Sequence, residues 1–425
     1  MATAIKSTKK TTTSSKGNVF ATLSDRPRFT GKKIITMHKD APMASMKSLT
    51  KKASLKMASI RDFASGTSDY QQAFSQGDGI YFDTLKIAIV NGGNDDQVNF
   101  MTEKGIDNNN AIQVEPERFV YALPLAKKTK TIKHPVLQSF TDNDIATWGV
   151  QAIKVLASAF TGKGINIAVL DTGLNLKHPD FSRLTIQSQS FIKSQAVEDK
   201  NGHGTHCCGI AVGAIDKKTN QRYGVASGAN LFVGKVLSNS GSGDDSGILA
   251  GIEWALLNKC RVISMSLGSA VGAGETFSPA YENAAKIALD KDCIIIAAAG
   301  NESQRSFGLV SPVGHPANCP SIFSVAAIDS NMRIADFSCG GINPNGGQVD
   351  IAAPGVDIFS SWKGKKHNTI SGTSMATPFV AGLAALLCEA NPGESAAHIW
   401  MKLTQHALRL DLESADVGAG LAQAQ

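Results

Sequence analysis

Hydrophobic and polar positions follow two different patterns along this chain, and the pattern changes near Trp148. Beyond that residue, short and almost continuously apolar runs alternate with stretches that have helical spacing. Such runs predict strands buried on both faces, and the stretches between them predict helices that cover a parallel sheet on both sides. The predicted strands are 165–170, 231–237, 262–267 and 293–299, and the predicted helices are 248–258, 281–289 and 379–390.

Before Trp148 the elements are shorter and less regular. Apolar runs predict strands over 28–37, 85–90 and 118–124, the last of which ends at a proline. The run 42–61 has too few apolar residues to decide between helix and loop. The sequence therefore predicts a small α/β domain in this part of the chain.

These patterns predict four segments and the fold class. The first residues are rich in Ser, Thr and Lys and low in complexity, which is typical of a disordered segment. Lys127–His134 is strongly basic and predicts an exposed linker. The predicted segments are a disordered basic tail (1–27), a small α/β domain (28–124), a linker (125–145) and an α/β domain with a doubly wound, mostly parallel sheet (146–425).

Charge and cysteine content narrow the class of protein. The 425 residues carry a net charge of +6, but residues 1–61 alone carry +12, so the remainder is mildly acidic. We interpret the basic segment as a solvated tail, with attraction to the body or to an anionic partner as the alternative. Seven scattered cysteines do not form a disulfide framework and favour a reducing compartment.

Location and partners are inferred from features that the sequence does not show. The first residues lack the apolar centre of a secretory signal, so we expect a cytoplasmic protein, with export by another route left open. No stretch is expected to be long and apolar enough to span a membrane. The basic residues lack the interleaved aromatic residues that single-strand binding uses, so neither a membrane nor a nucleic acid is expected as a partner.

Four polar residues stand where a parallel sheet collects function, at strand ends and helix starts. Asp171 and Asn301 follow predicted strands, and His203 precedes small residues that can begin a helix. Ser374 lies among small residues just before the predicted helix 379–390. A helix N-terminus stabilises negative charge, which suits a serine whose attack creates an oxyanion. Serine is a weak nucleophile, so it needs a base and an orienting acid.

Other interpretations of these residues were weighed. An aspartate after a strand often only caps a turn. His203, His206, Cys207 and Cys208 are metal-ligand types, although Cys208 would point away from the others on a helix. His206 is interpreted instead as a structural histidine. The order of the residues disfavours an α/β-hydrolase. A non-enzymatic scaffold with a binding N-terminus is the remaining alternative, and the joint presence of all four polar residues argues against it.

The order Asp, His, Ser, together with five sequence blocks, resembles the subtilisin-like serine proteases, and a cysteine after His206 is similar to their proteinase K-like branch. The blocks are 169–173, 203–207, 264–268, 298–301 and 372–378. The resemblance implies a serine endopeptidase in which Ser374 attacks the scissile carbonyl and His203 transfers its proton. Asp171 would orient His203, and Asn301 would donate its side-chain amide to the oxyanion.

The resemblance also implies where a substrate binds. Two runs of mostly small residues would pair with an extended peptide, and a third would form the wall of an uncharged pocket. These residues are Gly241, Ser242 and Gly243, then Ser266, Leu267 and Gly268, and finally Ala298, Ala299 and Gly300. Asp244 and Asp245 could favour basic substrate residues, but we interpret them as solvated loop acids.

Residues 28–124 resemble the inhibitory prodomain of these proteases. The resemblance implies a domain that assists folding, with Arg118–Leu123 lying in the active site as a product. Self-cleavage is then expected between Leu123 and Ala146, and an uncleaved domain that mediates contacts is the alternative. The prodomain would be an intramolecular partner, beside the peptide or protein substrate.

No cofactor is expected for catalysis, and no metal is expected at the catalytic residues. Asp180 matches a position that binds structural calcium in some relatives, but 216–222 does not resemble the loop that supplies the other ligands. Calcium is therefore allowed rather than predicted. Cys207, near His203, could make activity sensitive to thiol reagents.

Overall fold

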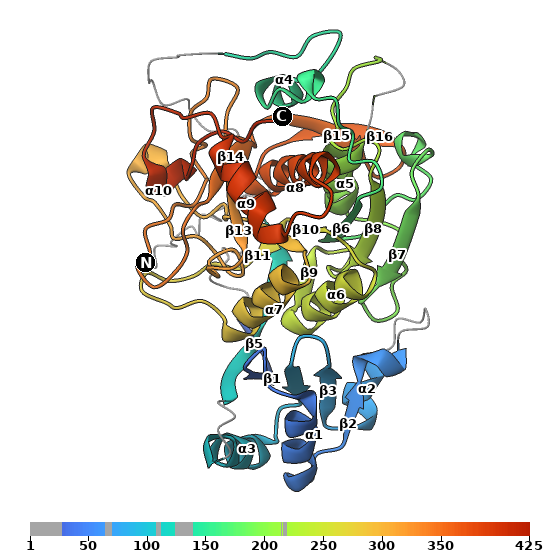
Figure 1. Cartoon of the computed structure of the whole chain (residues 1–425), viewed down its shortest axis with the longest axis vertical. Coiled ribbons are helices and arrows are strands. Elements are labelled where there is room, and N and C mark those ends of the chain that lie inside the picture. Colours follow the sequence, from blue (N-terminus) through green and yellow to red (C-terminus); the bar gives the residue numbers. More distant parts are fainter. Residues whose placement is uncertain (1–27, 64–69, 108–111, 124–138, 214, 216–218) are drawn as a thin grey trace, which may run out of the picture.

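The computed structural model describes residues 28–63, 70–107, 112–123, 139–213, 215 and 219–425. The predicted tail 1–27 and the predicted linker 127–134 lie outside these ranges. Figure 1 shows a large body above a smaller N-terminal lobe, which meet where β5 (Ile112–Ala122), α6 (Asp245–Leu257) and α7 (Pro279–Asp290) lie side by side. The limits predicted for the four segments remain predictions.

Seven parallel strands form the central sheet of the body, in the order β14-β13-β12-β10-β6-β8-β7. The four strands predicted in this part of the chain are confirmed as β6, β8, β10 and β12, whereas β7, β13 and β14 were not predicted. Their bounds are β6 Asn166–Asp171, β7 Ile186–Ser190, β8 Asn230–Lys235, β10 Val262–Met265, β12 Ile294–Ala298, β13 Phe323–Ile328 and β14 Ile351–Pro354.

Helices cover both faces of this sheet, as the sequence predicts. Successive strand residues point to opposite faces. Leu170 faces α6, because a Cβ added to Gly251 of that helix would lie 3.2 Å from the Leu170 side chain. Asp171 points to the other face, where it forms a hydrogen bond with His203 of α5. α5 packs against α8, and α6 packs against α7. These helices are α5 His203–Val212, α6 Asp245–Leu257, α7 Pro279–Asp290 and α8 Thr373–Ala390.

The longest of these helices, α8, starts at Thr373 rather than at Phe379 as predicted. Pro378 lies inside it and has no N–H to donate to the carbonyl of Ser374. The Ser266 hydroxyl donates to that carbonyl instead, at 2.8 Å. α8 is also long and apolar enough to cross a bilayer, so the expectation that no stretch could do so is wrong. It is 89% buried, as in a core helix.

The N-terminal lobe is a sheet with the order β5-β1-β4-β3-β2, which carries α1 and α3 on one face. The undecided run 42–61 forms a helix, then a short strand and a turn of 3₁₀ helix. The bounds are β1 Phe29–Met37, α1 Met43–Lys52, β2 Met57–Ser59, α2 Gln72–Gln76, β3 Gly79–Phe82, β4 Ile87–Val90, α3 Asp95–Asp107 and β5 Ile112–Ala122.

The two faces of the lobe sheet belong to different cores. Ile34 and Ile89 pack into the large core of the body, whereas Ile35 and Val90 pack with α1 and α3 in a small separate cluster. The strands alternate between the two cores because their side chains alternate in direction. The lobe is therefore seated on the body through an apolar sheet face.

A hairpin, two short strands and three further α-helices complete the described α-helices and strands. The hairpin of β15 and β16 packs on α5. Two short strands, β9 and β11, join the sheet of the lobe. The bounds are α4 Trp148–Ala152, β9 Ser242–Asp244, β11 Leu267–Gly268, β15 Ile358–Trp362, β16 Lys366–Ile370, α9 Ala396–Gln405 and α10 Ser414–Val417.

Candidate active site

Asp171 and His203 form a buried pair at the carboxyl edge of the sheet. Asp171 ends β6 and His203 begins α5, and Nδ1 of His203 lies 2.8 and 3.0 Å from the two carboxylate oxygens. Burial by itself lowers the pKa of His203, but the Asp171 carboxylate outweighs it and raises this pKa well above 6.5. With Nδ1 donating to Asp171, the neutral ring carries its lone pair on Nε2.

Local packing explains why α5 begins at His203. Gly202 has φ +108°, and a Cβ there would lie 2.5 Å from the Trp362 ring, so only glycine fits. Asp199 then caps the helix, because its carboxylate accepts from the N–H groups of Gly202 (2.8 Å) and Thr205 (2.9 Å). Together these residues fix the direction in which His203 leaves the backbone.

Ser374 lies in the first turn of α8 and exchanges two hydrogen bonds with Ser266. Its Oγ donates to the Ser266 carbonyl at 3.2 Å. Nε2 of His203 is buried and has no hydrogen-bond partner within the described ranges. Cys207 contacts both residues. Its Sγ lies 3.8 Å from Nδ1 of His203 and 3.6 Å from the Ser374 carbonyl oxygen. The serine hydroxyl is thus directed away from the base in this structure.

Asn301 is held beside Ser374 by Thr373. Its Oδ1 accepts from the backbone N–H (2.9 Å) and the hydroxyl (2.8 Å) of Thr373. A Cβ added to Gly372 would lie 3.1 Å from Nδ2, so the amide nitrogen points toward Gly372. Sequence reasoning found Asn301 but missed Thr373. The only signal was the position of Thr373 directly before Ser374.

The two predicted peptide-binding edges lie on either side of β5. Val120 pairs with Gly243 and Tyr121 with Ser242 on β9, while Ala122 pairs with Leu267 on β11. The Ala122 N–H also donates to the Gly241 carbonyl at 2.8 Å. All three strands are antiparallel to their neighbours here, so β5 fills the groove between the edges.

The same register places the residue after β5 beside the serine. Because Ala122 is opposite Leu267 in an antiparallel pair, Leu123 comes opposite Ser266. The Ser266 carbonyl is the acceptor of the Ser374 hydroxyl. Leu123 is buried, and its side chain would lie 3.6 Å from a Cβ added to Gly268. The segment Arg118–Leu123 therefore leads directly to Ser374.

The third predicted binding run, Ala298, Ala299 and Gly300, is buried at the end of β12. Gly300 has φ +118°, and its N–H donates to the Thr373 hydroxyl at 3.2 Å. These contacts connect β12 to the start of α8. The run lies next to Asn301, but it does not pair with β5.

Asp244 and Asp245 are not the solvated loop acids that the sequence analysis assumed. Asp244 caps α6 through the Gly247 N–H at 2.9 Å. Asp245 is fully buried and accepts from the Arg118 backbone N–H (2.7 Å) and from Nε2 of His315 (3.1 Å). The interpretation was wrong because the lobe covers both acids, and a sequence does not show what covers a loop.

Two lobe carboxylates, which sequence reasoning missed, cap helices of the body. Glu117 accepts from the Ser246 N–H at 3.0 Å in the first turn of α6, and Glu115 accepts from the Ala280 N–H at 2.9 Å in the first turn of α7. Burial, with the nearby Asp244 carboxylate, raises the pKa of Glu117. Their spacing of two residues on one strand was the available signal.

The four residues of the alternative His/Cys metal cluster do not come together. His206 directs Nε2 at the carbonyls of Ile358 and Asn368, both at 3.1 Å, and burial lowers its pKa to about 3. This confirms a neutral structural histidine. In the described part of the chain, the ligand atoms that do gather here are those of Asp171, His203 and Cys207. Burial raises the pKa of Cys207 to about 11, so its thiol is protonated near neutral pH.

Lys235 is a further buried charge near the site that sequence reasoning missed. It is opposite Asp171 in the sheet, and its ammonium donates to the Thr172 carbonyl and to Oδ1 of Asn239 (3.0 Å). Burial lowers its pKa. A lysine inside an otherwise apolar strand was the signal that could have revealed it.

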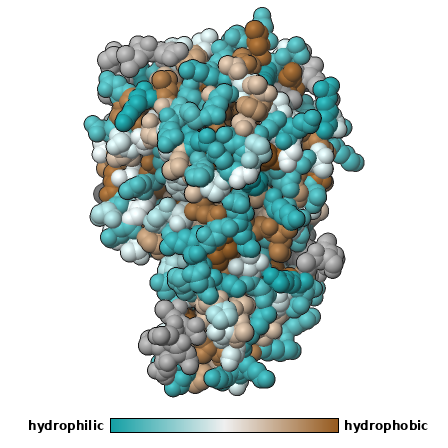
Figure 2. Space-filling model, viewed as in Figure 1, coloured by the Kyte–Doolittle hydropathy of each residue, from teal (hydrophilic) through white to brown (hydrophobic). Residues whose placement is uncertain are grey.

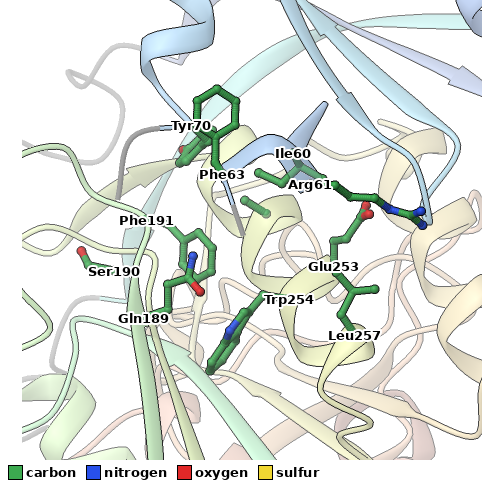
Figure 3. A pocket seen from close by; sticks show the side chains of 11 residues that line it. Ile60, Arg61, Phe63, Tyr70, Gln189, Ser190, Phe191, Glu253, Trp254 and Leu257 are labelled. Carbon is green, nitrogen blue, oxygen red and sulfur yellow. The ribbon is translucent and has the colours of Figure 1, made fainter. Parts of the chain in front are cut away.

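A separate pocket lies between the lobe and the body, away from these residues (Figure 3). Aromatic side chains from both parts line it, and none of the predicted site residues does. The aromatic lining residues are Phe63 and Tyr70 from the lobe and Phe191 and Trp254 from the body. It is a gap in the interface rather than part of the candidate active site.

Comparison with known proteins establishes the class. A family model described as the Subtilase family matches residues 162–420, and the chain therefore belongs to this family. It is 37% identical to subtilisin DY of Bacillus licheniformis over 273 residues, which are 64% of this chain and 93% of that protein.

Two further relatives match a similar share of this chain. Subtilisin E of Bacillus subtilis is 38% identical over 283 residues, 65% of this chain and 70% of that protein. A thermostable alkaline protease of Halalkalibacterium halodurans is 36% identical over 288 residues, 67% of this chain and 74% of that protein. The chain is a subtilisin-like serine endopeptidase, acts on peptides or proteins, and needs no cofactor for catalysis.

Proposed function

We propose that Ser374, His203 and Asp171 form the catalytic triad of this endopeptidase. A rotation of the Ser374 side chain moves Oγ from the Ser266 carbonyl toward Nε2 of His203, which takes the proton as Oγ attacks the scissile carbonyl. Asp171 stabilises the resulting imidazolium. His203 then returns the proton to the leaving amine, and water hydrolyses the acyl-enzyme. The Asp171–His203 hydrogen bond supports this assignment.

The oxyanion is stabilised by the side-chain amide of Asn301 and by the backbone N–H of Ser374 at the start of α8. Thr373 binds the oxygen end of the Asn301 amide, so Nδ2 is already oriented before a substrate arrives. A preoriented donor needs no reorganisation when charge develops, which favours the transition state over the bound substrate.

The N-terminal lobe acts as the inhibitor of its own body, and the chain is made as a self-processing zymogen. The observation that carries this proposal is β5, which pairs with both edges of the groove and leads to Ser374. A peptide substrate would add a strand in the same place. The helix caps by Glu115 and Glu117 support the docked position of the lobe.

The cysteines favour a reducing compartment, and we place the enzyme in the cytoplasm. All seven are buried and unpaired in the described residues. Proteins of oxidising compartments usually pair such thiols. Structural calcium, which is common in the family, is allowed but not predicted for this chain.

Intact-mass spectrometry of wild type beside Ser374→Ala tests the proposed function. We expect wild type to lose its first 123 to 145 residues, while Ser374→Ala stays full length. If both stay full length, self-processing is wrong, and peptide hydrolysis by wild type decides whether the triad assignment survives. If both are shortened alike, the cut is made by another protease and the zymogen proposal loses its support.

A third sample in this experiment locates the cut. Pro124 follows Leu123 and has no backbone N–H, and its ring carbon stands where the amide hydrogen of another residue would be. Pro124→Ala removes this obstacle. If Ser374 attacks the Leu123 carbonyl, a fragment ending at Leu123 appears faster in Pro124→Ala than in wild type. Equal rates, or an unchanged fragment ending later, place the cut within 125–145.

A further inference from the structure

Three metal-ligating side chains gather at a second place, outside the candidate catalytic residues. One ligand atom each of His178, Asp180 and His367 lies within 4.8 Å of the other two. His178 caps the short 3₁₀ helix Pro179–Phe181, which contains Asp180, whereas His367 comes from β16. Their side chains are 0%, 1% and 13% exposed. The cluster is almost completely shielded from solvent, and His367 is its most exposed member.

One oxygen of this cluster is unsatisfied. Oδ2 of Asp180 accepts from the Tyr223 hydroxyl at 2.6 Å and lies 2.8 Å from Nε2 of His367. Oδ1 of the same carboxylate is buried and has no hydrogen-bond partner in the described ranges. A buried carboxylate oxygen without a partner is costly, and each such atom needs an explanation. A bound cation would satisfy it.

The histidines are arranged as metal ligands usually are. Nε2 of His178 lies 2.9 Å from the Lys366 carbonyl, which can only accept, so neutral His178 carries its lone pair on Nδ1. Nδ1 accepts from the Asp180 N–H at 3.3 Å and lies 3.8 Å from Oδ2 of Asp180, so a bound ion would replace this long hydrogen bond. A metal-bound histidine typically donates its other N–H to a carbonyl in this way. The ring of His367 is stacked on Phe359, with 4.9 Å between ring centres, which fixes its plane.

We propose that His178, Asp180 and His367 bind a zinc-type divalent transition metal ion. Imidazole nitrogens with a carboxylate suit zinc, and three protein ligands leave a fourth position for water. Calcium fits this cluster poorly, because it takes six to eight oxygen ligands and two of these three donors are nitrogens. The inference does not depend on the proposed triad or on self-processing.

Binding at this cluster would stabilise the region around the catalytic base. The ion would join the 3₁₀ helix Pro179–Phe181 to β16, and the β15–β16 hairpin packs on α5. His206 of α5 already contacts carbonyls of both hairpin segments. A ligand that binds only the folded state raises the unfolding temperature. The metal would therefore act as a structural clamp and supply no catalytic step.

The test uses the full chain carrying Ser374→Ala, which prevents self-digestion, after its metals are removed with a chelator. We expect one zinc ion per chain in equilibrium dialysis. At saturating zinc the unfolding temperature should rise by about 5 °C, while calcium has little effect. His367→Gln should weaken zinc binding at least about tenfold. His398→Gln, at an exposed histidine of α9, is the matched control and should bind as before.

Further variants keep the test decisive. His178→Gln should lose zinc like His367→Gln, and circular dichroism at the dialysis temperature checks that both variants are folded. Cys207→Ala reports on the other group of ligand atoms, at Asp171 and His203. Loss of zinc in Cys207→Ala but not in His367→Gln would place the ion at the candidate active site and overturn the proposal. Absence of zinc binding by the Ser374→Ala chain would overturn it too.

Discussion

The sheet of the body and the sheet of the lobe meet at the same groove, but their faces are buried in different ways. The body sheet is parallel and buried on both faces, and the candidate catalytic residues stand at or near its carboxyl edge. The lobe sheet divides its two faces between a small core of its own and the core of the body. Figure 2 shows apolar side chains among polar ones where the two parts meet.

This difference shows what each part needs from the other. The hydrogen bonds Asp171–His203, Ser266–Ser374 and Asn301–Thr373 all join residues of the body. The lobe instead contributes a strand and two helix caps, and much of its apolar surface is covered only when it is docked. We therefore expect changes in the body to affect chemistry and changes in the lobe to affect inhibition.

The largest expected effect tests the orienting acid of the body. Asp171→Asn should lower kcat/KM toward a peptide roughly 10⁴-fold, because an asparagine favours the wrong tautomer of His203. The pKa of His203 is raised mainly by Asp171, and only the neutral ring is a base. Wild-type activity should therefore fall as pH drops through this raised pKa, and the acid limb should move to lower pH in the variant. An unchanged pH profile would contradict the assignment.

The next effect tests the oxyanion donor. Asn301→Leu should lower kcat by about 10²–10³ with little change in KM, a figure measured for this type of donor in subtilisin. Thr373→Val keeps the volume but removes the hydroxyl that binds Asn301, so a smaller loss is expected there. Steady-state kinetics on both variants checks this order. A larger loss in Thr373→Val than in Asn301→Leu would indicate that Thr373 acts by another route.

A smaller effect tests the lobe. Replacing both Glu115 and Glu117 by Ala should raise the peptidase activity of the full chain about 10–100-fold, since the charge-assisted hydrogen bonds that both carboxylates accept from the body are lost. The matched Gln variant keeps the acceptor oxygens and should stay closer to wild type. The rate of peptide hydrolysis before any processing is the measurement. Equal activity of the three chains would show that the lobe does not restrain the body through these caps.

The smallest effect concerns the cysteine beside the base. Cys207→Ala should change kcat/KM by less than about threefold, because the protonated thiol makes only long contacts at 3.6 and 3.8 Å. Thiol reagents that inhibit wild type should not inhibit this variant. Inhibition that persists in Cys207→Ala would assign the sensitivity to another buried cysteine.

Apolar runs were enough to predict four of the seven parallel strands of the body, β6, β8, β10 and β12, since strands buried on both faces must be almost continuously apolar. The sequence also marked the ends of β6 and β12, where Asp171 and Asn301 interrupt that pattern. The residues that cover a loop or complete a helix could not be predicted from the local sequence pattern. Asp245 is buried because the lobe lies over it, and α8 begins at Thr373 because Ser266 satisfies a carbonyl that Pro378 leaves without its helical donor. Such partners come from distant parts of the chain, and the local pattern of apolar residues does not depend on them.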